Sequence, residues 1–188
     1  MTRAPVGIDT PRLRLRPFAP ADAAAHERLY ADPEVTRYLA RGPFLGAQIV
    51  ERSRSALSRF AAHWERHGFG VWAVIDRATS EIIGQCGLNT LTEIPEVEVL
   101  YALARPAWGR GLAREAAGAA LADGFGRVGL QRIVGLVHPD NRASQRVLEK
   151  LGLVHARDLP ILGIDARYYE ITRSTYLTAV AHGSPHLG

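Results

Sequence analysis

The sequence predicts one α+β domain built around a mixed β-sheet. Three observations support this fold class: alternation of apolar and polar residues marks short strands, apolar residues three or four positions apart mark helices, and a strand-helix-strand crossover follows in the second half. The chain has 188 residues, of which 47% are hydrophobic and 22% charged, and this suits a single domain with a substantial core. We expect the domain to span residues 1–178, with an unstructured tail over 179–188.

The first third of the chain predicts one strand and two helices. Residues 12–16 read Arg-Leu-Arg-Leu-Arg and alternate as a strand does when one face lies on a core. Pro20 opens an alanine-rich helix that reaches about residue 30, where Asp32-Pro33 closes it. A second helix is predicted from 48 to about 65, because apolar residues recur there at spacings of three, four or seven.

The rest of the chain predicts an antiparallel meander followed by the crossover. The predicted strands cover 69–75, 81–88, 96–103, 132–137, 153–158 and 167–175, and the predicted helices cover 109–125 and 141–151. Gly152 ends the second of these helices. The whole chain should therefore contain a largely antiparallel central sheet of six to seven strands and about four helices.

Composition argues against several classes of function. The single cysteine, Cys86, cannot form an internal disulfide or supply a multi-thiolate metal site. Lys150 is the only lysine and lies outside any Gly-Lys-Ser/Thr sequence, so a phosphate loop of the nucleotide-hydrolysing type is not expected. No apolar run is long enough for a membrane span, and the N-terminus lacks the apolar segment of a signal peptide. We therefore expect a cytoplasmic protein that does not act on membranes.

The formal net charge of +4 suggests an anionic partner. The arginines are dispersed along the chain, however, and do not form the basic block that nucleic-acid binding favours. A phosphorylated small molecule therefore suits the charge better than nucleic acid does.

A glycine-rich turn between the predicted strand 96–103 and the helix 109–125 is the most informative segment. It reads Trp108-Gly109-Arg110-Gly111-Leu112-Ala113. Glycine permits positive φ and close backbone approach, and the N–H groups of a first helical turn lack partners within the helix, so the turn suits a pyrophosphate group. An ordinary strand-to-helix turn is the alternative. A dinucleotide fingerprint is rejected, because Arg114 stands where Gly or Ala is required and the turn follows the fourth strand.

A second segment opens the helix 141–151. At about 100° per residue, Ser144 falls within an apolar stripe on this helix, whereas five polar residues lie outside it; the stripe is Ala143, Val147, Leu148 and Leu151, and the polar residues are Arg142, Gln145, Arg146, Glu149 and Lys150. A hydroxyl on a buried face needs a partner, and the carbonyl four residues earlier is the simplest one. Asn141 is placed to cap the helix.

Together these segments resemble the acetyl-CoA-binding signature of the GNAT acetyltransferases. The loop pattern of that superfamily, Gln/Arg-x-x-Gly-x-Gly/Ala, falls on Trp108, Gly111 and Ala113, with tryptophan in place of Gln/Arg. Asn141-x-x-Ser144 followed by Leu-Glu-Lys-Leu-Gly is similar to the hallmark of the ribosomal-protein N-terminal (Rim-type) branch, as is the start Thr-Pro-Arg-Leu-Arg-Leu-Arg. The resemblance covers nearly the whole chain. It implies the α/β/α-layered GNAT fold, acetyl-CoA as cosubstrate without a metal, and direct transfer of acetyl to a primary amine in a ternary complex.

The resemblance also implies roles for individual residues. The CoA pyrophosphate would be held by the loop residues Trp108, Gly109, Arg110, Gly111, Leu112 and Ala113. Leu103, at a strand end, and Asn141 would contact the pantetheine arm. Ser144 would lie near the CoA sulfur and protonate the departing thiolate. Many relatives carry a tyrosine acid where this chain has Leu148, so either Ser144 gains importance or water supplies that proton.

Glu98 is the candidate catalytic base. An amine must be neutral to attack, so its ammonium form must first lose a proton, directly or through water. Alternation places Glu98 on the face of Leu100 and Ala102, opposite Tyr101, and apolar surroundings would raise the carboxyl pKa. The resemblance supports this role, because Rim-type enzymes often carry Glu at this position. A solvated carboxylate at the strand end is the alternative.

The acceptor amine would be a protein N-terminus or a small molecule, selected by the variable regions 30–68 and 159–166. The second region is fairly apolar and is a candidate surface for a homodimer. A CoA-binding sensor without transfer activity is the main alternative function, motivated by the missing tyrosine. His63 and His67 have a spacing that can bind metal, but they lack the His-Glu-x-x-His order and a third ligand nearby.

Overall fold

Eight strands form a single sheet in the computed structural model, which describes residues 7–39, 43–161 and 163–182. The strand order is β1-β2-β3-β4-β5-β6-β8-β7. Their bounds are β1 (Ile8–Asp9), β2 (Leu13–Pro17), β3 (Val71–Asp76), β4 (Ile82–Thr90), β5 (Val97–Leu103), β6 (Arg132–Val137), β7 (Val154–Ile161) and β8 (Ile164–Thr172). Neighbouring strands are antiparallel except for β5 and β6, which are parallel. The parallel pair results from the crossover through α4.

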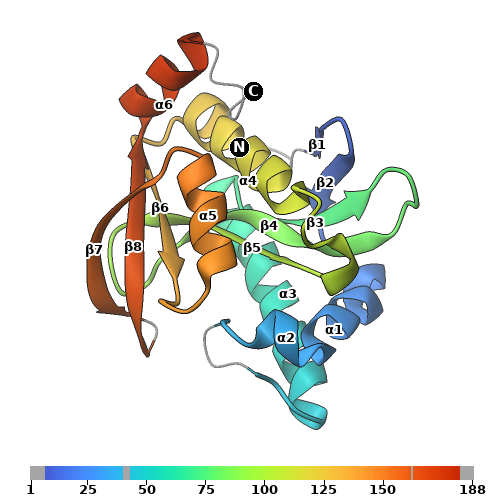
Figure 1. Cartoon of the computed structure of the whole chain (residues 1–188). Coiled ribbons are helices and arrows are strands. Elements are labelled where there is room, and N and C mark those ends of the chain that lie inside the picture. The colour runs from blue at the N-terminus through green and yellow to red at the C-terminus, as the bar shows by residue number, and fades with distance from the viewer. Residues whose placement is uncertain (1–6, 40–42, 162, 183–188) are drawn as a thin grey trace.

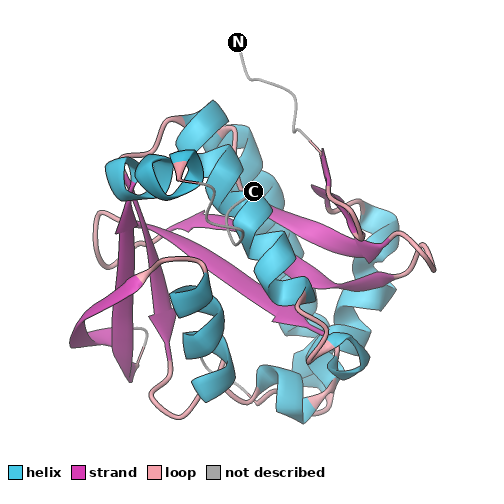
Figure 2. Ribbon diagram, turned by 45° about the horizontal axis from the view of Figure 1, so that its top comes forward, coloured by secondary structure: helices cyan, strands magenta, loops and turns pink. Residues whose placement is uncertain are grey.

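Helices cover both faces of the sheet, which gives the predicted α/β/α layers (Figures 1 and 2). Their bounds are α1 (Ala23–Ala31), α2 (Pro33–Thr36), α3 (Ala47–His67), α4 (Leu112–Asp123), α5 (Arg142–Lys150) and α6 (Arg173–Ala181). Short 3-10 turns precede α1 (Pro20–Asp22) and follow β5 (Arg105–Ala107), and a π-helical turn (Gly124–Val128) extends α4. Helices α4 and α5 lie on one face, whereas α1 and α3 lie on the other (Figure 1).

The main core lies between the sheet and α4 with α5. Small residues on α4, Ala116, Ala117 and Ala120, are fully buried and let the helix approach the strands closely. At Gly124, directly after α4, the chain also lies close to the sheet, because an added Cβ would be 2.7 Å from Leu88 Cδ1 on β4. A smaller apolar cluster lies under α1 and α3 and includes Ala102 of β5. Strand β5 is therefore packed from both sides, which fixes the direction of its alternate side chains.

The predicted fold class is confirmed, but the element count differs in the first third. The sheet has eight strands rather than six to seven, because β1 has only two residues and leaves no alternating pattern. Asp32-Pro33 does end α1, yet it also begins α2. Asp32 accepts a hydrogen bond from the Glu34 N–H (3.0 Å), and Pro33 occupies the first helical turn, where its missing N–H costs nothing.

The C-terminal predictions need three corrections. The last strand ends at Thr172, whose side chain accepts from the Thr175 N–H (3.3 Å) and begins α6. This helix reaches Ala181, so residues 179–181 are helical rather than part of an unstructured tail; residues 183–188 lie outside the described residues. The region 159–166, expected as a loop, largely belongs to the paired strands β7 and β8.

None of the helices within the described ranges is long and apolar enough to cross a membrane.

Candidate active site

The candidate site lies where β5 and β6 separate. Only one residue pair, Glu98 and Val134, is in register between these parallel strands, although β5 continues to Leu103 and β6 to Val137. Figure 1 shows β6, β7 and β8 turned away from β4 and β5. We call the diverging segments 99–103 and 135–137 the fork. Helices α4 and α5 follow these two strands, so both helix N-termini lie near the fork.

The glycine-rich turn exposes the N-terminus of α4. Gly109 and Gly111 have φ values of 72° and 75°, in the left-handed region that favours glycine. Gly111 is the N-cap and offers no side-chain cap. The first bond within the helix joins the Glu115 N–H to the Gly111 carbonyl (3.1 Å), so earlier N–H groups such as those of Leu112 and Ala113 have no acceptor inside the helix. This geometry suits a phosphate group.

Glu115 anchors the α4 N-terminus to the start of the sheet. Its carboxylate accepts hydrogen bonds from Thr10 Oγ1 (2.6 Å), from the Arg12 N–H (2.9 Å) and from Arg12 Nε (2.6 Å). Burial alone would raise its pKa, but these hydrogen bonds lower the pKa below its ordinary value. Arg12 also donates to the Arg110 carbonyl (2.8 Å). Sequence reasoning missed this support, because its residues are about 100 positions apart in the chain.

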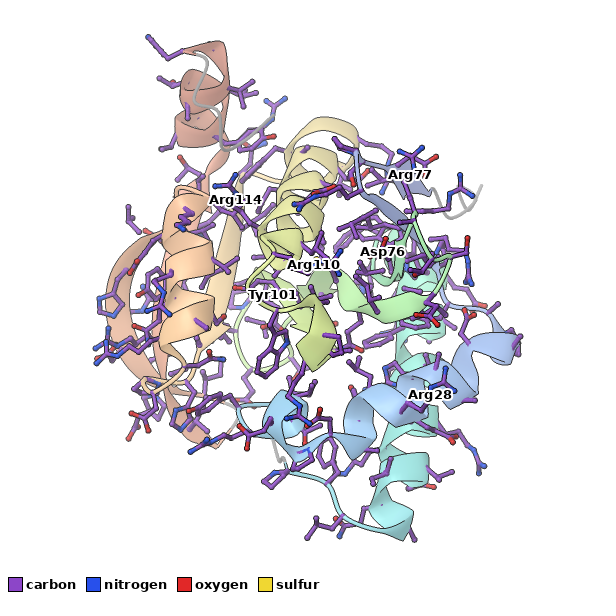
Figure 3. All side chains as sticks on the ribbon, turned by 45° about the vertical axis from the view of Figure 1, so that its right-hand side comes forward. Arg28, Asp76, Arg77, Tyr101, Arg110 and Arg114 are labelled. Carbon is purple, nitrogen blue, oxygen red and sulfur yellow. The ribbon has the colours of Figure 1, made fainter. Side chains whose placement is uncertain are left out.

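Trp108 ties the glycine-rich turn to the end of β5. Its indole Nε1 donates to the Leu103 carbonyl at 2.6 Å. The superfamily pattern has Gln or Arg at this position, and the indole N–H explains how a tryptophan can hold the turn against the strand. The Leu103 carbonyl, expected to contact the pantetheine arm, therefore already accepts a hydrogen bond from this chain. Arg110 extends toward β3, with Nη2 3.4 Å from Asp76 Oδ2 (Figure 3).

Asn141 and Ser144 meet at the start of α5. Asn141 Oδ1 accepts from the Ser144 N–H (3.1 Å), so the predicted helix cap is confirmed. The Ser144 hydroxyl does not follow the simplest expectation for a helical serine. Its Oγ lies 2.9 Å from the Tyr101 hydroxyl on β5, and the Tyr101 hydroxyl oxygen also lies 3.2 Å from the Ser144 carbonyl oxygen. Tyr101 thus joins β5 to α5.

The predicted polar face of α5 is wrong at one position. Gln145 was placed outside the buried stripe, but it is only 3% exposed. Its amide Nε2 donates to the Pro139 carbonyl (2.7 Å), and its Oε1 accepts from Arg142 (3.3 Å) and Arg167 (3.2 Å). Ala143, which belonged to the predicted stripe, is exposed. The Pro139 carbonyl, in the turn after β6, requires a hydrogen-bond donor, and helical periodicity cannot predict that Gln145 supplies it.

Glu98 is held on the other face of β5 from Tyr101. Its Oε1 accepts from Asn89 Nδ2 on the neighbouring strand (3.2 Å). Burial raises the pKa of Glu98 to about 7, and the hydrogen bond from Asn89 offsets only part of that rise. A carboxyl with this pKa is half ionised near neutral pH, which suits proton transfer. The Glu98 side chain is half-buried, so it is not the fully exposed carboxylate of the alternative interpretation.

His63 and His67, whose spacing could bind a metal, take part in contacts within the fold. His63 Nε2 accepts from the Thr90 N–H (3.0 Å), so Nδ1 carries the proton and donates to the Phe69 carbonyl (2.8 Å). Both ring nitrogens of His63 are therefore hydrogen-bonded. The His67 ring packs against the His63 ring, with the two ring centroids 4.4 Å apart. Cys86 is fully buried, and burial raises the pKa of its thiol. These residues contribute no reactive group at the fork.

Residues 12–154 match the family described as the acetyltransferase (GNAT) domain. The chain belongs to the GNAT acetyltransferase family. Its relatives include an uncharacterized N-acetyltransferase of Bacillus subtilis, YoaA, which is 32% identical over 146 residues that cover 77% of this chain and 81% of that protein. The FsC-acetyl coenzyme A-N(2)-transacetylase of Aspergillus fumigatus is 29% identical over 187 residues, covering 90% of this chain and 77% of that protein.

Solved structures give the same answer for the fold. The acetyltransferase from Agrobacterium tumefaciens superimposes with a TM-score of 0.78 at 30% identity, over 88% of this chain and 94% of that one. The predicted GNAT fold and N-acetyltransferase activity are thus confirmed at the level of the family. Because GNAT acetyltransferases use acetyl-CoA, the fork and its two helix N-termini are the place to look for its binding site.

Proposed function

We propose that this GNAT enzyme transfers acetyl from acetyl-CoA to a primary amine by direct attack in a ternary complex. The observation that carries the proposal is the placement of two proton-handling groups at one fork. Glu98 lies on one face of β5, and Ser144 is hydrogen-bonded to Tyr101 on the other face. A thioester and an amine that meet at the fork would therefore have a base on one side and a hydroxyl on the other.

The residues present fit acetyl-CoA as a ligand. The pyrophosphate would lie against the backbone N–H groups of the loop 108–113, where two left-handed glycines bring the backbone close and the α4 dipole favours an anion. Asn141 and the end of β5 would face the pantetheine arm. Acetyl-CoA would supply the thioester carbonyl that is attacked and the thiol that leaves.

The protein's own residues would manage the protons. Glu98 would accept a proton from the ammonium form of the acceptor, directly or through water, and thereby leave the nitrogen lone pair free to attack. Ser144 would donate a hydrogen bond from its hydroxyl to the sulfur that departs, and water would supply the proton that completes the thiol. Neither step requires a protein nucleophile, which agrees with the burial of Cys86.

We also propose that the chain belongs to the Rim-type branch, with acceptors that are protein N-termini or small-molecule amines. The support is the Asn141-x-x-Ser144 segment with Leu-Glu-Lys-Leu-Gly after it, together with Glu98 ahead of Tyr101. A cytoplasmic location, a homodimer and the lack of nucleic-acid and membrane partners stay predictions from the sequence.

Calorimetric titration with acetyl-CoA tests the binding half of the proposal. Gly111→Glu should abolish binding, because it puts a side chain and a negative charge against the pyrophosphate site. Gly129→Glu is the matched control, since Gly129 also has a left-handed φ (80°) and open space around its Cβ position, but it lies at the other end of α4. Absence of binding at millimolar acetyl-CoA, or equal affinity in Gly111→Glu, would refute the assigned loop.

Thiol release with a panel of amines tests the transfer half. The panel should contain short peptides with free N-termini and simple primary amines, with acetyl-CoA alone as the background. Amine-dependent release of thiol is expected for at least one acceptor, and Glu98→Gln should slow it. Tight binding of acetyl-CoA with no turnover on any amine would instead favour the alternative function, a CoA-binding sensor.

A further inference from the structure

Tyr101 and Ser144 form a polar contact between β5 and α5 beside the fork. The two hydroxyl oxygens are 2.9 Å apart, and the Tyr101 hydroxyl is also 3.2 Å from the Ser144 carbonyl. Figure 3 labels Tyr101 beside the segment that leads into α4, with α5 next to it. The Tyr101 ring packs against the main core, so the hydroxyl is held in place by a rigid ring on a paired strand.

The Tyr101 hydroxyl keeps its proton at the pH at which an amine is acetylated. Burial raises the pKa of Tyr101, and the hydrogen bond to Ser144 offsets only part of this rise. A protonated hydroxyl is a permanent donor with a single hydrogen. Ser144 Oγ is the nearer of its two acceptors, at 2.9 Å against 3.2 Å for the Ser144 carbonyl. With the Tyr101 hydrogen on Oγ, the serine is the acceptor in this contact, and its own hydrogen is free for a third group.

Without this contact, the Ser144 hydroxyl would have a different partner. A serine in the first turn of a helix commonly bonds back to a carbonyl three or four residues earlier, here in the turn 140–141. Its hydrogen would then point into the helix and away from the fork. Hydrogen bonds in a chain also polarise one another, so a donor on Oγ strengthens the donation that Ser144 itself makes.

We infer that Tyr101 is a positioning residue that holds the Ser144 hydroxyl with its hydrogen directed toward the leaving sulfur. The inference rests on the role proposed above for Ser144. As the bond between the acetyl carbon and sulfur breaks, its electron pair stays on sulfur, and the Ser144 hydroxyl donates a hydrogen bond to it. The proton that completes the thiol comes from water, so Ser144 and Tyr101 both end the cycle unchanged. One strand thus carries the base, Glu98, on one face and the support for the leaving group on the other.

A double-mutant cycle of Tyr101→Phe and Ser144→Ala tests this role with acetyl-CoA and an amine that the wild type accepts. Tyr101→Phe keeps the ring and should lower kcat about tenfold, with the KM for acetyl-CoA changed less than about twofold. Ser144→Ala should lower kcat at least as much. The double variant should be no slower than Ser144→Ala, because Tyr101 acts through that hydroxyl.

Tyr169→Phe is the matched control. Tyr169 is buried in the same core, and its hydroxyl donates to Glu149 on the same helix α5 (3.3 Å), so the change removes a comparable hydrogen bond. It should leave kcat unchanged. Thermal unfolding and calorimetric binding of acetyl-CoA, measured for every variant, separate a positioning role from a general loss of packing.

Three outcomes would overturn the inference. Wild-type kcat in Tyr101→Phe with a slow Ser144→Ala rejects the positioning role and leaves the proposed function intact. Defects that multiply in the double variant, or a raised KM with unchanged kcat, assign Tyr101 to packing or ligand binding. Wild-type kcat in Ser144→Ala rejects the proposed role of Ser144 itself, and the inference with it.

Discussion

The Glu98→Gln variant should become increasingly stable relative to the wild type as the pH rises. Burial raises the pKa of Glu98 from its ordinary value of 4.5 to about 7. Between these two values the unfolded chain has released a proton that the folded protein still holds, so the stability of the wild type falls as the pH rises through this window. Glutamine has a similar shape and no charge to bury, so the variant lacks this loss.

The pKa difference sets the size of the effect. The full difference between the two pKa values amounts to about 3 kcal/mol, at 1.36 kcal/mol per pKa unit. Most of it falls within an accessible range. From about pH 5.5 to about pH 8, the wild type should lose about 2 kcal/mol of unfolding free energy relative to Glu98→Gln.

Denaturant unfolding of both proteins across this pH range measures the difference directly. Glu51→Gln is the matched control, because Glu51 is exposed on α3 and the change in charge is the same. Its stability relative to the wild type should not vary with pH in this way. A constant difference between the wild type and Glu98→Gln from acid to neutral pH would refute the raised pKa, and with it the physical basis for choosing Glu98 as the base. Activity adds a second measurement: the rate should rise with pH through an apparent pKa near 7.

Three further substitutions test the supports of the fork. Trp108→Phe removes the hydrogen bond to the Leu103 carbonyl. It should weaken acetyl-CoA binding, measured by calorimetry, and lower the free energy of unfolding by about 1 kcal/mol, measured with denaturant. If neither value changed, the indole hydrogen bond would be dispensable. Gln145→Leu leaves the Pro139 carbonyl without its amide donor and should cost about 1–3 kcal/mol in the same unfolding assay, whereas a more stable variant would contradict that account. Asn141→Ala removes the α5 cap and should cost about 1 kcal/mol, with Asn141→Asp as the control that keeps the acceptor and most of the stability.

Local patterns were enough to predict most elements of this fold. The alternation in 12–16 and the spacing of apolar residues in 48–65 correspond to β2 and α3, because one buried face leaves a regular period in the sequence. The failures came where an element was too short for a period or began at a polar cap. Strand β1 has two residues, α2 has four, and α6 begins at the cap of Thr172 within what reads as a strand.

Within the site, local signals identified the turn at 108–113, Asn141 and the face of Glu98. They did not identify the contacts that hold these groups. The Glu115 carboxylate meets Arg12 across about 100 positions, and the Tyr101 hydroxyl meets Ser144 across 43 positions. Gln145 was missed for a related reason: its burial depends on the unsatisfied carbonyl of Pro139, which no periodicity records.

The sequence by itself therefore determined the family and the order of the main elements, and it supplied the candidate residues for the chemistry. Those properties depend on local spacing, on glycine at left-handed positions and on helix caps, and each of these involves only a few neighbouring residues. Only the tertiary structure decided which groups act together. The pKa of Glu98 is raised because the folded chain removes water from its carboxyl group. The orientation of the Ser144 hydroxyl depends on how closely β5 and α5 pack, and that distance is a property of the folded core.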